Sequence, residues 1–272
     1  MQSHIKHNIH ATTGPKLIFS IKNSAYSADC LTLQKIDRME TRLATDEKNG
    51  MGSIAMTDYR PKNKIINALA IVLSYVFHPL FIPVYLLWLL LNTQAYMFAQ
   101  FSPSEKALAL VRFFIIYSFF PLVTVLLAKG LGFLKSIHLK TQKERIIPYI
   151  ASNIYYFWMC YVLRHQTEFP REAIYLSMAI FIASSAGLMA NIYMKVSMHT
   201  MGMGIMIAFT GMMAMAEANN YTIYFSAAIL IAGLVSTARM IASDHTPAEI
   251  YTGLVIGVLS LIVAIWADGI LP

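Results

Sequence analysis

The chain has 272 residues, of which 57% are hydrophobic and only 13% are charged, and its mean hydropathy is +0.55. Soluble domains carry about 25% charged residues, so this composition excludes that class and predicts a protein whose apolar surface meets lipid. The formal charge of +7 comes from basic residues spread along the chain. This distribution favours anionic lipid head groups over nucleic acid as partners. Cys30 and Cys160 are too few to predict a disulfide framework or a zinc site.

Residues 1–60 are polar, mixed in charge and without the apolar core of a cleavable signal peptide. We expect them to form a disordered N-terminal segment, followed by a transmembrane domain over residues 61–272. The second region contains apolar stretches separated by short polar breaks, most of them near the roughly 20 residues that a bilayer crossing requires. These stretches lack the alternation of apolar and polar residues that membrane barrels show. The predicted fold class is therefore all-α, a polytopic transmembrane bundle of about six or seven helices.

Seven apolar stretches are candidate membrane helices. They are residues 66–91, 107–128, 146–164, 173–192, 200–217, 222–241 and 250–267. The first is long and contains His78-Pro79 and Pro83, so it is either one kinked helix or a helix broken partway. We expect His78 to have a structural role there. Gly253 and Gly257 form a small-xxx-small pair that would let the last helix approach a neighbour closely.

Ionisable groups are costly near the bilayer, so their positions are the main functional signal in such a sequence. Three clusters of them lie between predicted helices: residues 135–145, residues 195–199 and residues 239–249. Two predicted helices separate each cluster from the next. All three clusters must then face the same side of the membrane, whichever way the first stretch is resolved, and one composite site becomes possible.

The clustered residue types suit phosphoryl transfer. Arg239 can bind phosphate oxygens with its planar fork of donors. Lys140, Lys143 or Arg145 could stabilise the developing charge, and Ser197 could add a hydrogen bond. On a helix, Glu249 would lie one turn from His245 and hold one imidazole nitrogen, which leaves the other as a nucleophile. His199 would be the acid that protonates the leaving oxygen.

These residues resemble the motifs of the type 2 phosphatidic acid phosphatases, also called lipid phosphate phosphatases, over about residues 130–257. The family's third motif is Ser-Arg, five residues, His, three residues, Asp, and it is similar to Ala238-Arg239, five residues, His245, three residues, Glu249. The second motif, Pro-Ser-Gly-His, is similar to Val196-Ser197-Met198-His199. The resemblance implies a phosphohistidine on His245, oriented by Glu249, without a metal or another cofactor.

The same resemblance implies that His199 is the general acid and that Arg239 and Ser197 bind phosphate. The first motif differs most, because the family has Lys, six residues, then Arg-Pro, whereas here His138, six residues and Arg145 follow one another, and Ile146 comes after Arg145. Lys140 or Lys143 would then replace the family's lysine.

The resemblance predicts an integral membrane enzyme, placed in a bacterial inner membrane, that hydrolyses a lipid phosphate: phosphatidic acid, phosphatidylglycerol phosphate or an isoprenyl diphosphate. The partners expected are this lipid and the bilayer. Two alternatives stay open. One is a non-catalytic membrane protein. The other is a copper-binding or copper-transporting protein, because residues 198–215 are rich in methionine and thioethers bind copper(I).

Overall fold

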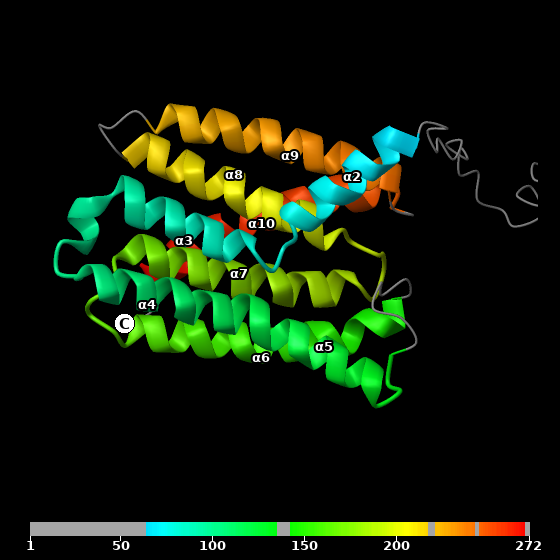
Figure 1. The fold of residues 1–272 in the computed structure, drawn as a ribbon, viewed down its shortest axis with the longest axis horizontal. Coiled ribbons are helices and arrows are strands. Elements are labelled where there is room, and N and C mark those ends of the chain that lie inside the picture. The colour runs from blue at the N-terminus through cyan, green and yellow to red at the C-terminus, as the bar shows by residue number, and fades with distance from the viewer. Residues whose placement is uncertain (1–63, 135–141, 217–220, 243–244, 270–272) are drawn as a thin grey trace, which may run out of the picture. The chain divides into compact units, whose positions relative to one another are not determined.

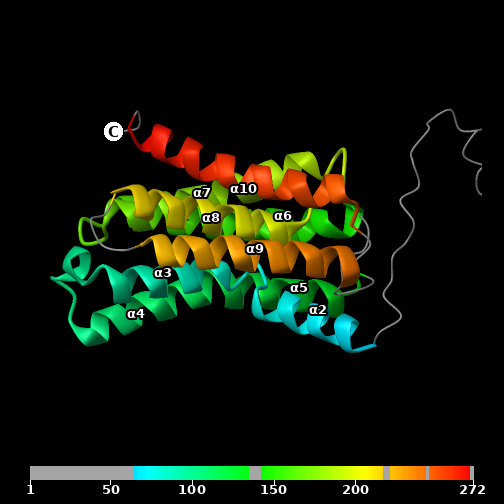
Figure 2. The same ribbon diagram turned by 90° about the horizontal axis from the view of Figure 1, so that it is seen from above.

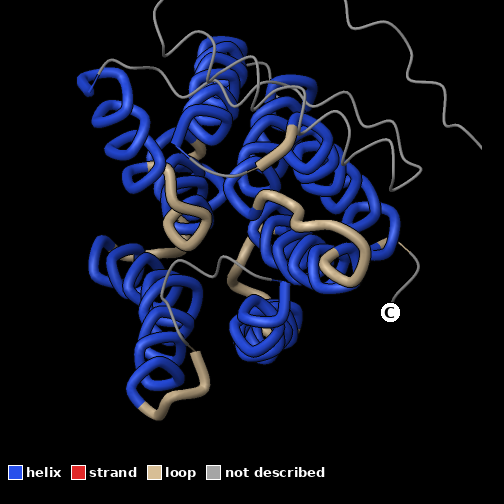
Figure 3. Tube along the Cα trace, turned by 90° about the vertical axis from the view of Figure 1, so that its right-hand side faces the viewer, coloured by secondary structure: helices blue, strands red, loops and turns tan. Residues whose placement is uncertain are grey.

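The computed structural model describes residues 64–134, 142–216, 221–242 and 245–269, all of which belong to one unit, Tyr59–Pro272. Within these ranges the chain forms helices and loops and no strand (Figure 3), so the predicted all-α fold class is confirmed. The expectation for residues 1–60 lies outside the described residues.

Six helical spans in the described part of the chain are long and apolar enough to cross a membrane, and each lies within four residues of a predicted stretch. The α-helices, labelled in Figure 1, are α2 (Lys64–Val76), α3 (Ile82–Thr93), α4 (Pro103–Phe113), α5 (Phe120–Gly130), α6 (Gln142–Arg164), α7 (Arg171–Ala190), α8 (Met198–Ala216), α9 (Thr222–Ala242) and α10 (Pro247–Asp268). Two short elements join them: the 3-10 turn η1 (Ala95–Phe98) and the π-helical turn η2 (Phe114–Phe119). α4, η2 and α5 form one continuous span of 28 residues.

The first apolar stretch is a broken helix. α2 has 13 residues and α3 has 12, so neither alone reaches the roughly 20 residues that a crossing needs. α2 begins at the end of the bundle where α5 and α9 end, and α3 runs on to the opposite end (Figures 1 and 2). The two halves therefore make one crossing together, which gives seven crossings over the described residues.

Side chains satisfy the backbone groups that the break releases from the helical ladder. The ring nitrogen Nδ1 of His78 accepts the N–H of Leu80 at 3.3 Å, and the Ser118 hydroxyl, from η2, donates to the Leu80 carbonyl at 2.7 Å. The Tyr85 hydroxyl donates to the carbonyl of Val76 at 3.0 Å. Such pairing is required of irregular backbone at membrane depth. The expected structural role of His78 is thus visible in its hydrogen bond.

α8 is the most buried of the six spans, and α10 packs directly against it. A Cβ atom added to Gly204 would collide with the Leu254 carbonyl oxygen, and one added to Gly257 would collide with the Met201 carbonyl oxygen. A Cβ on Gly253 would meet side-chain and backbone atoms at the start of α8. The small-xxx-small pair therefore lies in a backbone-to-backbone contact, as its spacing indicated.

Substitution of Gly257 by alanine should destabilise the protein, since the new methyl group has no room beside Met201. Overpacking of this kind costs about 1–3 kcal/mol. The matched control is Gly233→Ala in α9, where nothing lies within 4 Å of the added Cβ. There the lower backbone entropy of alanine in the unfolded chain should stabilise by about 0.5–1 kcal/mol. Thermal unfolding in one detergent compares the two variants, and equal midpoints would contradict the proposed close contact.

Candidate functional site

The predicted clusters meet at one end of the bundle. α6, α8 and α10 begin there, and α5, α7 and α9 end there (Figures 1 and 2). The first cluster differs in detail from its expected position before the third helix, because α6 starts at Gln142 and so contains Lys143 and Arg145 in its first turn. Lys140 lies outside the described residues, so its predicted phosphate-binding role stays a prediction.

His245 and Glu249 form the expected pair at the start of α10. Nδ1 of His245 lies 3.0 Å from Oε2 of Glu249, which also accepts the backbone N–H of Thr246 at 3.0 Å. Thr246 in turn caps the helix by accepting the N–H of Glu249. A capping box therefore fixes the carboxylate. Because a carboxylate accepts hydrogen bonds, the proton of a neutral His245 sits on Nδ1, and its Nε2 lone pair is available.

Burial lowers the pKa of His245, and the positive charges of Arg145 and Arg239 lower it further. The hydrogen bond and the charge of Glu249 act in the opposite direction but do not cancel these effects. The side chain of His245 is 6% exposed. A histidine in this environment is neutral at pH 7, which is the protonation state that a nucleophile requires.

Arg145 and Lys143 lie two residues apart in the first turn of α6 but differ in burial. Arg145 is buried, and its Nη1 donates to the Val196 carbonyl at 3.0 Å, in the segment that leads into α8. Its charge also interacts with Glu249. Lys143 is exposed at the helix end. Of the two, Arg145 is the one that the fold brings to the His245–Glu249 pair.

Ser197 connects α8 to α10. It is fully buried, and its backbone N–H donates to the carbonyl of Glu249 at 3.2 Å. Its hydroxyl oxygen lies 3.5 Å from the N–H of Thr200, a long capping contact at the start of α8. The hydroxyl proton is not used by that contact, so the hydroxyl can still donate to a phosphate oxygen. The phosphate-binding role of Ser197 stays a prediction.

His199 contacts the broken first crossing. Its Nε2 lies 3.1 Å from the carbonyl oxygen of Ser74 in α2, so Nε2 is the donor of that bond. The ring packs edge-to-face on His78, with centroids 5.0 Å apart. Sequence reasoning gave His78 a structural role only, and no motif links residue 78 to residue 199. The contact arises because the break in α2–α3 lies beside the start of α8.

Arg239, in the last turn of α9, links the three histidines electrostatically. Its charge acts on His78, His199 and His245, and it also interacts with Arg145. Two arginines from different helices therefore lie beside a histidine pair and a histidine–glutamate pair. An anion such as a phosphate group would reduce the repulsion between the two guanidinium groups.

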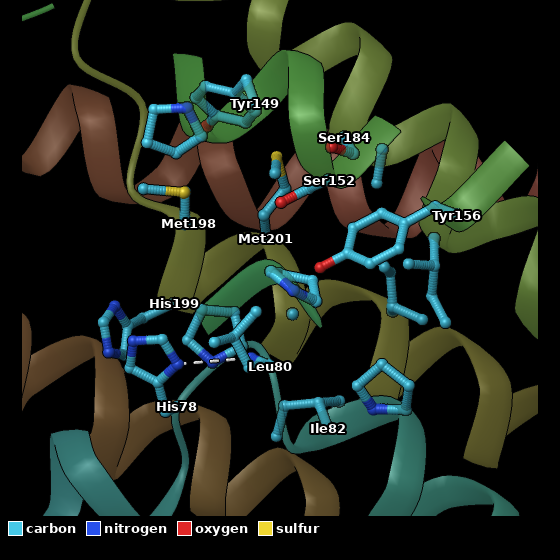
Figure 4. Close-up of a pocket in the computed structure, with 18 of the residues that line it drawn as sticks. His78, Leu80, Ile82, Tyr149, Ser152, Tyr156, Ser184, Met198, His199 and Met201 are labelled. Atoms are coloured by element: carbon cyan, nitrogen blue, oxygen red, sulfur yellow. Dashed lines mark hydrogen bonds between the residues drawn. The ribbon is translucent and has the colours of Figure 1, made fainter. Parts of the chain in front are cut away.

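A cavity of about 160 Å³ begins at His78 and His199 and extends into the bundle (Figure 4). Its walls come from the α2–α3 break and from α3, α5, α6, α7 and α8, and most of the lining side chains are apolar. Tyr149, Ser152 and Tyr156 line it along α6. The polar end of this cavity is thus shared with the candidate site.

Other polar groups lie away from this site. Arg164 pairs with Asp268 at 3.1 Å at the opposite end of the bundle (Figure 1). Four methionines of α8 are buried in the apolar core: Met201, Met203, Met206 and Met213. Among the described residues no group of three or more His, Cys, Asp and Glu side chains is arranged to hold a metal ion.

Comparison with known protein families, curated proteins and solved structures finds no match to this chain. The candidate site therefore rests on its own residues and their geometry.

The pKa of His245 should lie below the ordinary value of 6.5. Replacing Glu249 by glutamine removes a charge that raises this pKa, so it should fall further, whereas Arg239→Gln removes a charge that lowers it, so it should rise. Histidine ring signals of the labelled protein in nanodiscs, titrated by NMR and assigned with a His245→Asn variant, measure these shifts. An unchanged pKa in both variants would show that neither charge lies near the imidazole.

Proposed function

We propose that this protein hydrolyses a phosphate or diphosphate ester of a membrane lipid, with His245 as the nucleophile. The observation that carries the proposal is the buried His245–Glu249 pair, held by a capping box and influenced by the charges of Arg145 and Arg239. The order and spacing of Ser197, His199, Arg239 and His245 support it, because they resemble the lipid phosphate phosphatase motifs.

In the first step, Nε2 of His245 attacks the phosphorus atom and forms a P–N bond while the bond from phosphorus to the lipid oxygen breaks. Glu249 accepts the Nδ1 proton in a hydrogen bond and stabilises the positive charge that develops on the imidazole. Arg145 and Arg239 stabilise the negative charge on the phosphoryl oxygens.

His199 supplies the proton that the leaving lipid oxygen needs. Its Nε2 donates to the Ser74 carbonyl, so the transferable proton is a second one, on Nδ1. The negative charge of a bound phosphate favours this doubly protonated ring. The products of this step are the lipid alcohol, or the lipid monophosphate from a diphosphate, and phosphohistidine.

Water then attacks the phosphohistidine. The P–N bond breaks, the water oxygen becomes part of inorganic phosphate, and the neutral His199 takes the water proton. His245 returns to its neutral state, so the cycle balances without an oxidant, a reductant or a metal.

Purified protein in nanodiscs should release phosphate from phosphatidic acid, phosphatidylglycerol phosphate or an isoprenyl diphosphate, and a chelator should not abolish the release. His245→Ala should lower kcat about a thousandfold or more, because the nucleophile is lost. Arg239→Gln and Arg145→Gln should each cost about a hundredfold, as removal of one preorganised charge-stabilising donor does. Radioactive phosphate from substrate should label the wild type, and not His245→Ala, in an acid-labile form.

The matched controls are His165→Ala, an exposed histidine between α6 and α7, and Lys129→Ala, an exposed cation near the site end of the bundle. Both should keep activity within about twofold, as surface substitutions usually do. Failure to release phosphate from every lipid tested, with the protein folded, would refute the phosphatase. Stoichiometric copper bound through the α8 methionines would favour the transport alternative.

The protein is an integral membrane protein by its six membrane-length apolar spans, and we infer that it resides in a bacterial inner membrane with the site on the cytoplasmic face. The inner membrane is supported by the helical architecture, since outer-membrane proteins are typically barrels. The face is supported by basic residues that the proposed chemistry does not use. In the sequence, Arg60 and Lys62 precede Lys64 at the start of α2, Lys135 follows Lys129 of the last turn of α5, and Lys195 precedes α8. These are six basic residues next to elements that begin or end at the site end, against three at the opposite end: Lys106, Arg164 and Arg171. Cytoplasmic segments carry such an excess of lysine and arginine.

Cysteine labelling of spheroplasts tests this orientation. In a Cys30→Ser background, Glu168→Cys at the opposite end should react with a membrane-impermeant maleimide in intact spheroplasts. Lys129→Cys should react only after lysis, because it faces the cytoplasm. The reverse pattern would place the site on the outer face.

A further inference from the structure

The cavity that His78 and His199 help to line has mostly apolar side chains in its walls, with a few polar ones among them. Along α8 its lining runs from Met198 to Ile205, a distance of about 10 Å at 1.5 Å per helical residue. Pro79, Pro83, Pro121 and Pro148 all line it. Rigid proline rings at these positions limit the rearrangement that would let the walls collapse. The cavity is therefore a lasting feature of the apolar interior.

The volume of about 160 Å³ sets the size of what can enter. An apolar protein cavity of about 150 Å³ accommodates a guest of the size of benzene. This space consequently holds a five- or six-carbon length of one hydrocarbon chain. A second chain segment of the same length would need as much volume again, which a cavity of this volume does not provide.

The chemistry of the site directs a chain into this space. The oxygen that His199 would protonate is the one that stays with the lipid product, and His199 lines the cavity beside His78 (Figure 4). Arg239, whose charge acts on His199 and His245, marks the side on which the phosphate lies. A chain that leaves the phosphate at His199 therefore continues past His78 into the apolar interior.

We infer that this cavity binds the hydrocarbon chain of a single-chain lipid phosphate, and that the enzyme prefers such substrates to two-chain glycerophospholipids. The inference rests on the proposed function for the reaction and on the cavity for the selectivity. Two sources share this chemistry: an isoprenyl phosphate or diphosphate, and a monoacyl lysophosphatidate.

Kinetics in nanodiscs compare three substrates: farnesyl diphosphate, oleoyl lysophosphatidate and dioleoyl phosphatidate. At least one single-chain substrate should exceed the two-chain substrate in kcat/KM by about tenfold or more, the scale on which a pocket discriminates by shape. The ratio between the two single-chain substrates identifies the source. Equal or faster hydrolysis of dioleoyl phosphatidate would overturn the inference while leaving the proposed function intact.

Variants of α7 test the cavity itself. Ala183→Leu places a larger side chain in the lining, and Ala186→Leu is the matched control, because Ala186 lies on the same helix but does not line the cavity. Ala183→Leu should lower kcat/KM for the preferred substrate about tenfold and leave hydrolysis of chainless phenyl phosphate unchanged. Equal loss on both substrates, or equal loss in the control, would overturn the inference. If Ala183→Leu does not fold, Ser184→Leu at the next lining position is read in the same way.

A binding measurement separates the two proposals. Dodecyl phosphate in excess should raise the Tm of wild type in nanodiscs by about 3 °C or more, and should raise that of Ala183→Leu by much less. This result without any phosphate release would support the cavity and refute the phosphatase. Phosphate release with an equal Tm shift in both proteins would support the phosphatase and overturn the cavity assignment.

Discussion

The close packing of α8 against α10 is the constraint on which the site depends. Glycine at positions 204 and 257 lets the two backbones meet. This contact fixes the axial register of the two helices, that is, the position of the first turn of α8 relative to the first turn of α10. In this register the Ser197 N–H donates to the Glu249 carbonyl at 3.2 Å. The same arrangement brings the Val196 carbonyl to Arg145. Packing between small residues is a driving force for helix association in lipid, where the hydrophobic effect gives none.

The break in the first crossing performs two tasks with the same residues. His78 satisfies a backbone N–H that the break releases and also packs on His199. Ser74, in the half-helix before the break, accepts from Nε2 of His199. Because unsatisfied backbone groups are costly in lipid, the break and the histidine pair hold each other in place. The π-helical turn η2 joins this arrangement through Ser118, as such turns often do near functional sites.

Hydropathy predicted the helices, because apolar stretches are a local property of the sequence. Helix counting predicted that the three clusters share one end of the bundle, because an even number of helices separates each cluster from the next. The His245–Glu249 pair was equally predictable, since both residues lie within one helical turn. Sequence could not decide whether the first stretch kinks or breaks, because one proline pattern permits both. The contact between His78 and His199 spans 121 residues in the sequence, and the cavity needs walls from the α2–α3 break and five helices. Such tertiary features carry no local signal, and the burial that separates Arg145 from Lys143 appears only once α6 is packed.

The membrane changes what a chain-binding cavity can contribute to catalysis. A lipid chain that enters it leaves a bilayer that is about as apolar as the cavity, so the transfer yields little of the roughly 0.8 kcal/mol per CH₂ that burial from water would give. Affinity for the proposed substrate must then come from its phosphate group and the two arginines, which are the groups that differ from lipid. In the proposed reaction the contribution of the cavity is orientation: a chain held along α8 would place the leaving oxygen at His199 and align the phosphorus with Nε2 of His245. Alignment of reacting groups lowers a barrier even where binding gains nothing, so in this proposal the cavity selects the lipid by shape rather than by hydrophobicity.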